Sequence, residues 1–280
     1  MIDIGIILII IGAVYCLIAS INDYKTMEVP DYLTITLLIM ALVVRASYSI
    51  ITNEWGVIMQ GLIGLGIFLV LGNLFYYGRV FGGGDAKLMI GLGAIIGISN
   101  DTMTNLKGYL AFIITFLIIG AVYGIIASIV IMIKEKKKSM KKELRKEIRK
   151  NKNLVITGII IGIIILVPII IIKETILYLI PLLIIITPVL LSWAAAYERT
   201  YMIKTIITKE LQPGDVITKN IKIKSGKTIK ASFEGITKKE IMMIKKARIK
   251  NVEIKNGIPF TLTFLITIIA YYYIISSGRI

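Results

Sequence analysis

The sequence predicts an all-α polytopic membrane protein with about eight (range six to nine) transmembrane helices and a small α+β cytoplasmic module near the C-terminus. Hydrophobic residues make up 56% of the 280 residues, and long isoleucine and leucine runs recur along most of the chain. About 20 consecutive apolar residues cross a bilayer as a helix. A membrane β-barrel would instead alternate apolar and polar residues, so helices are the expected spanning elements.

Eight apolar segments are expected to form these helices. The first has no basic residues ahead of it, unlike a cleaved signal peptide, so we expect it to remain as a helix. The fourth is short for a hydrocarbon core about 30 Å thick, and we expect it to be tilted or extended by a glycine loop. In order, the segments are Ile4–Ile21, Tyr32–Ile51, Gly56–Tyr77, Ala86–Ser99, Tyr109–Ile133, Leu154–Ile172, Thr175–Ala196 and Pro259–Ile275.

The positions of lysine and arginine predict the orientation. Two connections hold most of them, with 11 basic residues in 134–152 and 15 in 199–255. Because basic residues concentrate in cytoplasmic connections, the N-terminus is expected outside and these connections inside. Both the first and the third helix then end at the cytoplasmic face. Arg45, in the outer half of the second helix, is expected to snorkel toward the headgroups.

This orientation divides the chain into five regions: a membrane region over 1–133, a basic cytoplasmic loop over 134–153, two helices over 154–196, the cytoplasmic module over 197–258 and a final helix over 259–280. In the module, Thr237-Lys238-Lys239-Glu240 is a capping box that predicts a helix to about Arg248. Alternating stretches at Ile221–Lys224 and Val252–Ile254 predict strands.

Composition excludes several functions. The net charge of +16 comes from residues gathered between apolar segments, which favours anionic membrane lipids over nucleic acid as the partner of the basic surface. The chain has one cysteine, Cys16, and no histidine. Disulfide frameworks, HExxH metal sites and Ser-His-Asp triads are therefore impossible within the chain. We expect no metal and no cofactor.

Two aspartates are the candidate catalytic residues. Asp23 follows the first apolar run, and Asp85 follows the three glycines Gly82, Gly83 and Gly84. A charge near the bilayer centre costs about 2.5–3.5 kcal/mol on insertion scales, so an aspartate near a membrane helix suggests a functional site. Two carboxylates that share a site hold one proton between them, which supplies a base and an acid. The glycines remove β-carbons, so an extended substrate could approach Asp85 closely.

Structural roles are open for the same residues. Asp85 could be the N-cap of the fourth helix, and Asp23 an interfacial charge after the first. For Asp31, which follows Pro30, an N-cap role is favoured.

These segments carry a family resemblance. Asn22-Asp23-Tyr24-Lys25-Thr26-Met27-Glu28-Val29-Pro30-Asp31 resembles the first active-site segment of type IV prepilin peptidases, and Gly82-Gly83-Gly84-Asp85-Ala86-Lys87-Leu88 resembles their GxGD motif. Gly257-Ile258-Pro259-Phe260 resembles the C-terminal region of the archaeal branch, the preflagellin peptidases. The presenilin and signal peptide peptidase group shares GxGD, but there the motif lies late in the chain and Pro-Ala-Leu follows.

The resemblance implies an aspartic endopeptidase of the membrane that removes short basic class III leader peptides from archaellin or pilin precursors at the cytoplasmic face. Asp23 and Asp85 inherit the catalytic roles, supported by Gly82, Gly83, Gly84, Lys25, Lys87 and Pro30. Lys25 stands where the family usually has arginine, so a bidentate contact there is in doubt. The cysteines of the bacterial zinc domain are missing, and methyltransferase activity is not predicted.

Glu28 and Asp31 make the loop after the first helix acidic, and we expect one of them to attract the basic leader, with plain solvation of both as the alternative. Two other functions stay open. Glycine-interrupted helices with carboxylates also build ion-coupled transporters and channels, and the chain could be a non-catalytic membrane scaffold.

Overall fold

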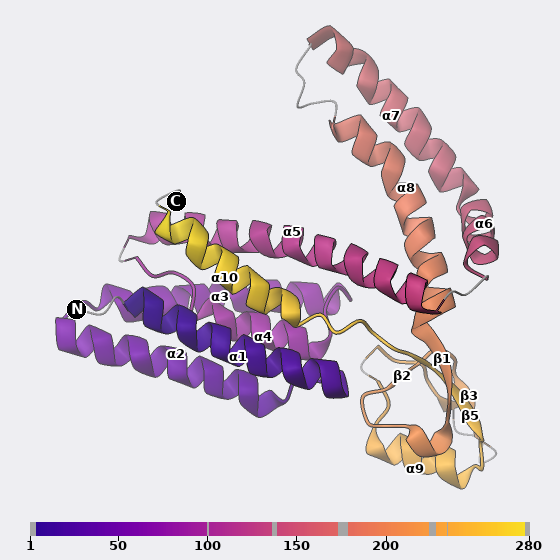
Figure 1. Cartoon of the computed structure of the whole chain (residues 1–280), viewed down its shortest axis with the longest axis horizontal. Helices are drawn as coiled ribbons and strands as arrows, with labels where there is room; N and C mark the ends of the chain where they lie inside the picture. Colours follow the sequence, from indigo (N-terminus) through magenta and orange to yellow (C-terminus); the bar gives the residue numbers. More distant parts are fainter. Residues whose placement is uncertain are drawn as a thin grey trace. The chain divides into compact units, whose positions relative to one another are not determined.

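The computed structural model describes residues 4–99, 101–135, 139–172, 179–223, 228–233 and 235–277. They form two compact units (Figure 1), the first from Met1–Ala127 with Gly257–Ile280 and the second from Ser128–Asn256. The expected start of a helix at Thr175, the end of the strand at Lys224 and the central residues 136–138 of the basic loop lie outside the described residues.

The first unit is a bundle of helices joined by short connections. Its chain returns at the C-terminus, where the last helix runs beside the first (Figure 1). A cluster of phenylalanines, including an edge-to-face contact between Phe81 and Phe116, packs inside the bundle. The helices are α1 (Ile4–Thr26), α2 (Asp31–Thr52), α3 (Gly56–Tyr77), α4 (Gly83–Gly93), α5 (Thr102–Glu135) and α10 (Leu262–Ser276). The last turns of α5 belong to the second unit.

Helix α4 differs from the expected segment Ala86–Ser99. It begins at Gly83, ends at Gly93 and has 11 residues, so it is shorter than a spanning helix. Its backbone lies very close to that of α3, because a β-carbon on Gly64 would come within 2.3 Å of the Gly93 carbonyl oxygen. Small residues at both positions allow this approach.

Arg45 explains why α4 ends early. Its guanidinium donates hydrogen bonds to the carbonyl oxygens of Ala94, at 2.7 Å, and Gly97, at 2.9 Å, and also to those of Val57, Ile95 and Ile96. The residue is completely buried. The expectation that Arg45 snorkels is therefore wrong, because its guanidinium donates inside the protein to four carbonyl groups of the segment just after α4 and to one at the start of α3.

The second unit combines apolar helices with the expected α+β module. Helices α7 and α8 lie side by side (Figure 1), and three strands form an antiparallel sheet in the order β1-β5-β2. The elements after α5 are α6 (Met140–Lys150), α7 (Lys152–Ile172), α8 (Leu179–Tyr197), β1 (Ile203–Ile207), β2 (Val216–Ile217), β3 (Ile221–Lys222), β4 (Thr228–Ile229), α9 (Lys238–Lys246) and β5 (Asn251–Lys255). The capping box of Thr237 and Glu240 is present, as predicted.

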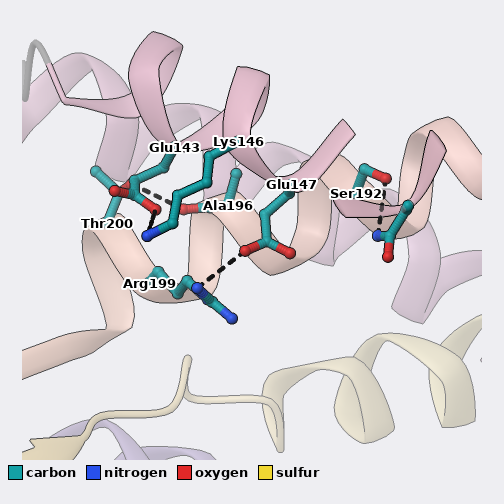
Figure 2. A network of polar contacts seen from close by, with 8 residues as sticks. Glu143, Lys146, Glu147, Ser192, Ala196, Arg199 and Thr200 are labelled. Atoms are coloured by element: carbon teal, nitrogen blue, oxygen red, sulfur yellow. Dashed lines mark hydrogen bonds and ion pairs between the residues drawn. The ribbon is translucent and has the colours of Figure 1, made fainter. Parts of the chain in front are cut away.

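An ion pair with one buried partner joins the basic segment to the π-helical turn Glu198–Met202 that follows α8. Figure 2 shows Glu147 of α6 facing Arg199, with 3.0 Å between a carboxylate oxygen and a guanidinium nitrogen. The Glu147 side chain is 3% exposed, whereas that of Arg199 is 42% exposed. Asn151 also donates to Ser192. The basic segment thus includes a packed amphipathic helix.

Five helices within the described residues are long and apolar enough to cross a membrane, or six if the bent pair α6 and α7 forms one span. They are α1, α2, α3, α5 and Ile180–Met202, which extends α8. This content, with the small strand-containing module, is that of an integral membrane protein that is mostly helical.

Candidate functional site

Asp23 is a buried carboxylate in the last turn of α1. The helix continues to Thr26 instead of ending near Ile21, so Asp23 lies within the helix and not after it. Its side chain receives two hydrogen bonds at Oδ2 from Thr261, one from the backbone N–H at 3.1 Å and one from the hydroxyl at 3.0 Å. An aspartate that accepts two donors on one oxygen is held in a fixed orientation.

Asp85 lies in the first turn of α4, partly buried. Gly82 is the N-cap of this helix, so an N-cap role for Asp85 is excluded. Burial, and next the negative charge of Asp23, raise the pKa of the Asp85 carboxyl to about 7, while the Gly82 backbone N–H opposes them by hydrogen bonding. The negative charge of Asp23 thus acts on Asp85 although the two residues are 62 positions apart in the sequence.

The two motifs also touch directly. Lys87 Nζ lies 2.6 Å from Asp31 Oδ1 in an ion pair between the start of α2 and the first turns of α4. Gly84 packs on the loop before α2, since a β-carbon there would come within 2.9 Å of Val29 Cβ. The missing side chain of Gly84 therefore leaves room for Val29.

The remaining predicted residues lie at helix ends or on the surface. Pro30 is the N-cap residue of α2, and Asp31 is its first helical residue, so an N-cap role for Asp31 is wrong. Lys25 and Glu28 are exposed in or just after the last turn of α1. Gly83 has open space, because an added β-carbon would meet its nearest atom only at 3.7 Å.

A recess with a volume of about 280 Å³ lies beside Thr261. The Tyr123 hydroxyl donates to the Pro259 carbonyl oxygen at 2.6 Å and fixes one wall. The recess is lined by Leu17, Ser20, Ile21, Tyr24, Lys25, Tyr123, Pro259, Thr261 and Leu262. Apart from Ser20, Lys25 and the hydroxyl groups, its lining is apolar.

No group of three or more His, Cys, Asp or Glu residues able to hold a metal ion occurs in the described parts of the chain. The site itself presents two carboxyl groups, a threonine hydroxyl and exposed lysines.

Comparison with known proteins finds similarity in the part of the chain that carries both aspartates. Residues 10–128 match the type IV leader peptidase family. The matched segment contains both aspartate motifs and confirms the resemblance drawn from them. Thr261 lies outside it.

Curated relatives match part of the chain. The chain is 38% identical to a preflagellin peptidase of Methanocaldococcus jannaschii over 87 residues, 31% of its length, and 33% identical to one of Methanococcus maripaludis over 87 residues. A preflagellin peptidase of Methanococcus voltae is 33% identical over 86 residues. The matches span 36–37% of the length of these relatives. No solved structure matches the chain significantly.

The contact of Thr261 with Asp23 was not predicted from the sequence. Thr261 lies one residue beyond Gly257-Ile258-Pro259-Phe260, whose resemblance was noted, and 238 positions after Asp23. A lone threonine at the start of an apolar segment gives no signal by itself. Only the folded chain, in which α10 returns beside α1, relates it to the aspartate.

Proposed function

We propose that the chain is a membrane-embedded aspartic endopeptidase that removes short basic leader peptides from archaellin or pilin precursors, with Asp23 and Asp85 as its catalytic pair. The observation that carries the proposal is the direct contact of the two family motifs through the Lys87–Asp31 ion pair, and the rise in the pKa of Asp85, caused in part by Asp23, supports it. The printed name of the relatives, preflagellin peptidase, supports this class of substrate.

The proposed roles follow from the surroundings of each carboxyl. Asp85, whose pKa is raised to about 7, is half protonated near neutral pH and serves as the acid. Asp23, which accepts two hydrogen bonds, serves as the base. Water attacks the scissile carbonyl carbon, its proton passes to Asp23, and Asp85 donates its proton to the carbonyl oxygen. The intermediate then collapses: one of its two hydroxyl groups returns its proton to Asp85 as the C=O bond re-forms, the C–N bond breaks, and Asp23 gives its proton to the leaving amine.

The proposal includes the expected orientation, with the N-terminus outside and the site at the cytoplasmic face, where the basic connections lie. It also includes eight membrane segments. The bent pair α6 and α7 would count as one, and the short helices α4 and α10 as two more. Asp85 lies in the first turn of α4, at the end of this short helix.

Substrate recognition is assigned to the acidic loop after α1. Asp31 is paired with Lys87, whereas Glu28 is exposed and forms no ion pair with another described residue. Glu28 is therefore the better candidate for a contact with the lysine or arginine of a leader peptide.

The test is cleavage of a panel of class III leader precursors by the full chain in membranes, with the cut position determined by mass spectrometry. We expect a single cut after the basic leader. Asp23→Asn should abolish it, whereas Asp101→Asn, at an exposed turn, should cleave at the wild-type rate. Uncut precursors with the wild-type chain, or equal cleavage by Asp23→Asn, would refute the proposal.

A further inference from the structure

Thr261 uses its side chain in an unusual way. It is the N-cap residue of α10, and threonine in this position ordinarily accepts a hydrogen bond from a backbone N–H of the first helical turn. Here the side chain makes no capping bond. Its hydroxyl donates instead to Asp23 Oδ2 at 3.0 Å.

The backbone of the same residue adds a second donor. The Thr261 N–H lies 3.1 Å from the same Oδ2, at the N-terminal end of a 15-residue helix. Unpaired N–H groups and the helix dipole favour a negative charge at this end. The start of α10 therefore offers Asp23 two hydrogen-bond donors and a helix dipole that favours its negative charge.

Burial makes this contact rigid. Thr261 is 1% exposed and Asp23 is 8% exposed. The segment before Thr261 is also fixed, because the Tyr123 hydroxyl donates to the Pro259 carbonyl oxygen. Both donors act on Oδ2, so the other carboxylate oxygen, Oδ1, takes no part in this contact.

We propose that Thr261 is the positioning residue that holds Asp23 in its catalytic orientation. The start of α10 therefore belongs to the site. The catalytic role of Thr261 rests on the proposed function, whereas the contact between Thr261 and Asp23 does not. It extends the site beyond residues 10–128, the segment of the family match.

Thr263 offers a matched control. It is a completely buried threonine two residues further on, and its hydroxyl donates to the Phe260 carbonyl oxygen at 2.7 Å. Thr263→Val removes a buried hydroxyl of the same helix start without touching Asp23. Thr261→Val keeps the side-chain shape but removes the donor, and Thr261→Ser keeps the donor.

The experiment measures kcat and KM for precursor cleavage by the four proteins. Displacement of a reacting group by about 1 Å can cost on the order of a hundredfold, so Thr261→Val should lower kcat by about ten- to a hundredfold with KM within about twofold. Thr261→Ser and Thr263→Val should stay within about threefold of wild type. Wild-type kcat in Thr261→Val, an equal loss in Thr263→Val, or failure of Thr261→Ser to restore kcat would overturn the proposal.

A stability measurement separates this idea from the proposed function. In a double-mutant cycle of thermal unfolding, Thr261→Val should lower the melting temperature of the wild type but have no effect in an Asp23→Ala background, because contacting residues are not additive. Equal shifts in both backgrounds would refute the contact, whether or not the chain cleaves a precursor. Absence of cleavage by the wild type would refute the proposed function alone.

Discussion

Lys87 and Asp31 form an ion pair, with 2.6 Å between Nζ and Oδ1, that connects the two aspartate motifs on their exposed side. The two side chains are 51% and 69% exposed. Exposed pairs contribute at most about 1 kcal/mol to folding. The pair therefore adds little to stability. Its role is to set the position of α4 relative to the start of α2.

Charge reversal tests that role. Asp31→Lys would oppose Lys87 with a like charge, and we expect it to lower cleavage several-fold while the melting temperature stays within about 3 °C of wild type, as for an exposed pair. Adding Lys87→Asp restores the attraction and should recover most of the activity. If the double variant is as poor as the single one, the pair does not set the geometry.

Two neighbouring glycines should respond differently to alanine. A β-carbon on Gly84 would come within 2.9 Å of Val29 Cβ and 3.3 Å of its backbone nitrogen, whereas Gly83 has room. Overpacking of this kind costs about 1–3 kcal/mol, so Gly84→Ala should lower both the melting temperature and the cleavage rate. Gly83→Ala, at the first position of the same helix, should do neither. Equal tolerance of the two substitutions in thermal unfolding would contradict the packing of Val29 on Gly84.

The activity should decrease as the pH rises through about 7. Asp85 acts in its protonated form, and its pKa is raised to about 7 by burial and by Asp23. Above that pH the protonated fraction, and with it kcat, should fall about tenfold per pH unit. The free energy of unfolding should also decrease as the pH rises. A carboxyl whose pKa is raised in the folded state favours that state while it is protonated, and this contribution is lost when the carboxyl ionises. Melting curves of the wild type and Asp85→Asn between pH 5 and 8 should diverge, with only the wild type losing stability. A kcat that keeps rising to pH 9 would exclude Asp85 as the acid.

Arg45 should be indispensable for folding. Its replacement by methionine leaves the carbonyl groups at the end of α4 buried without donors, and we expect a loss of about 3 kcal/mol or more. Lysine should not rescue it, because a single ammonium group cannot replace the planar guanidinium. Arg79→Met, at an exposed position, is the control. Unchanged unfolding of Arg45→Met in detergent would show that the hydrogen bonds contribute little.

Glu28→Lys tests recognition of the leader. If Glu28 attracts the basic leader, the KM for that precursor should rise about tenfold or more, as for loss of a charge-assisted contact, while a precursor with a neutralised leader is cleaved as by the wild type. Glu54→Lys, another exposed acid of the same unit, should not distinguish the two precursors. Equal loss on both by Glu28→Lys would mean that the residue acts on structure.

The sequence predicted those features that depend on local order. Asp23 and Asp85, their spacing, the apolar helices and the Thr237 capping box follow from runs and motifs that can be read along the chain. Three features could not be predicted because they depend on contacts between distant segments. Arg45 caps α4 from 49 positions away, Lys87 pairs with Asp31 over 56, and Thr261 reaches Asp23 over 238. The early end of α4 follows from the first of these contacts.

The most direct test of the account is the cleavage rate of Asp23→Asn, of Asp85→Asn and of the double variant on one leader precursor. Because residues that act as one unit are strongly non-additive, each single variant should lose about 10⁴-fold in kcat, and the double variant should lose hardly more. If either single variant kept more than about a tenth of the wild-type kcat, or if the two losses multiplied, Asp23 and Asp85 would not be one catalytic pair.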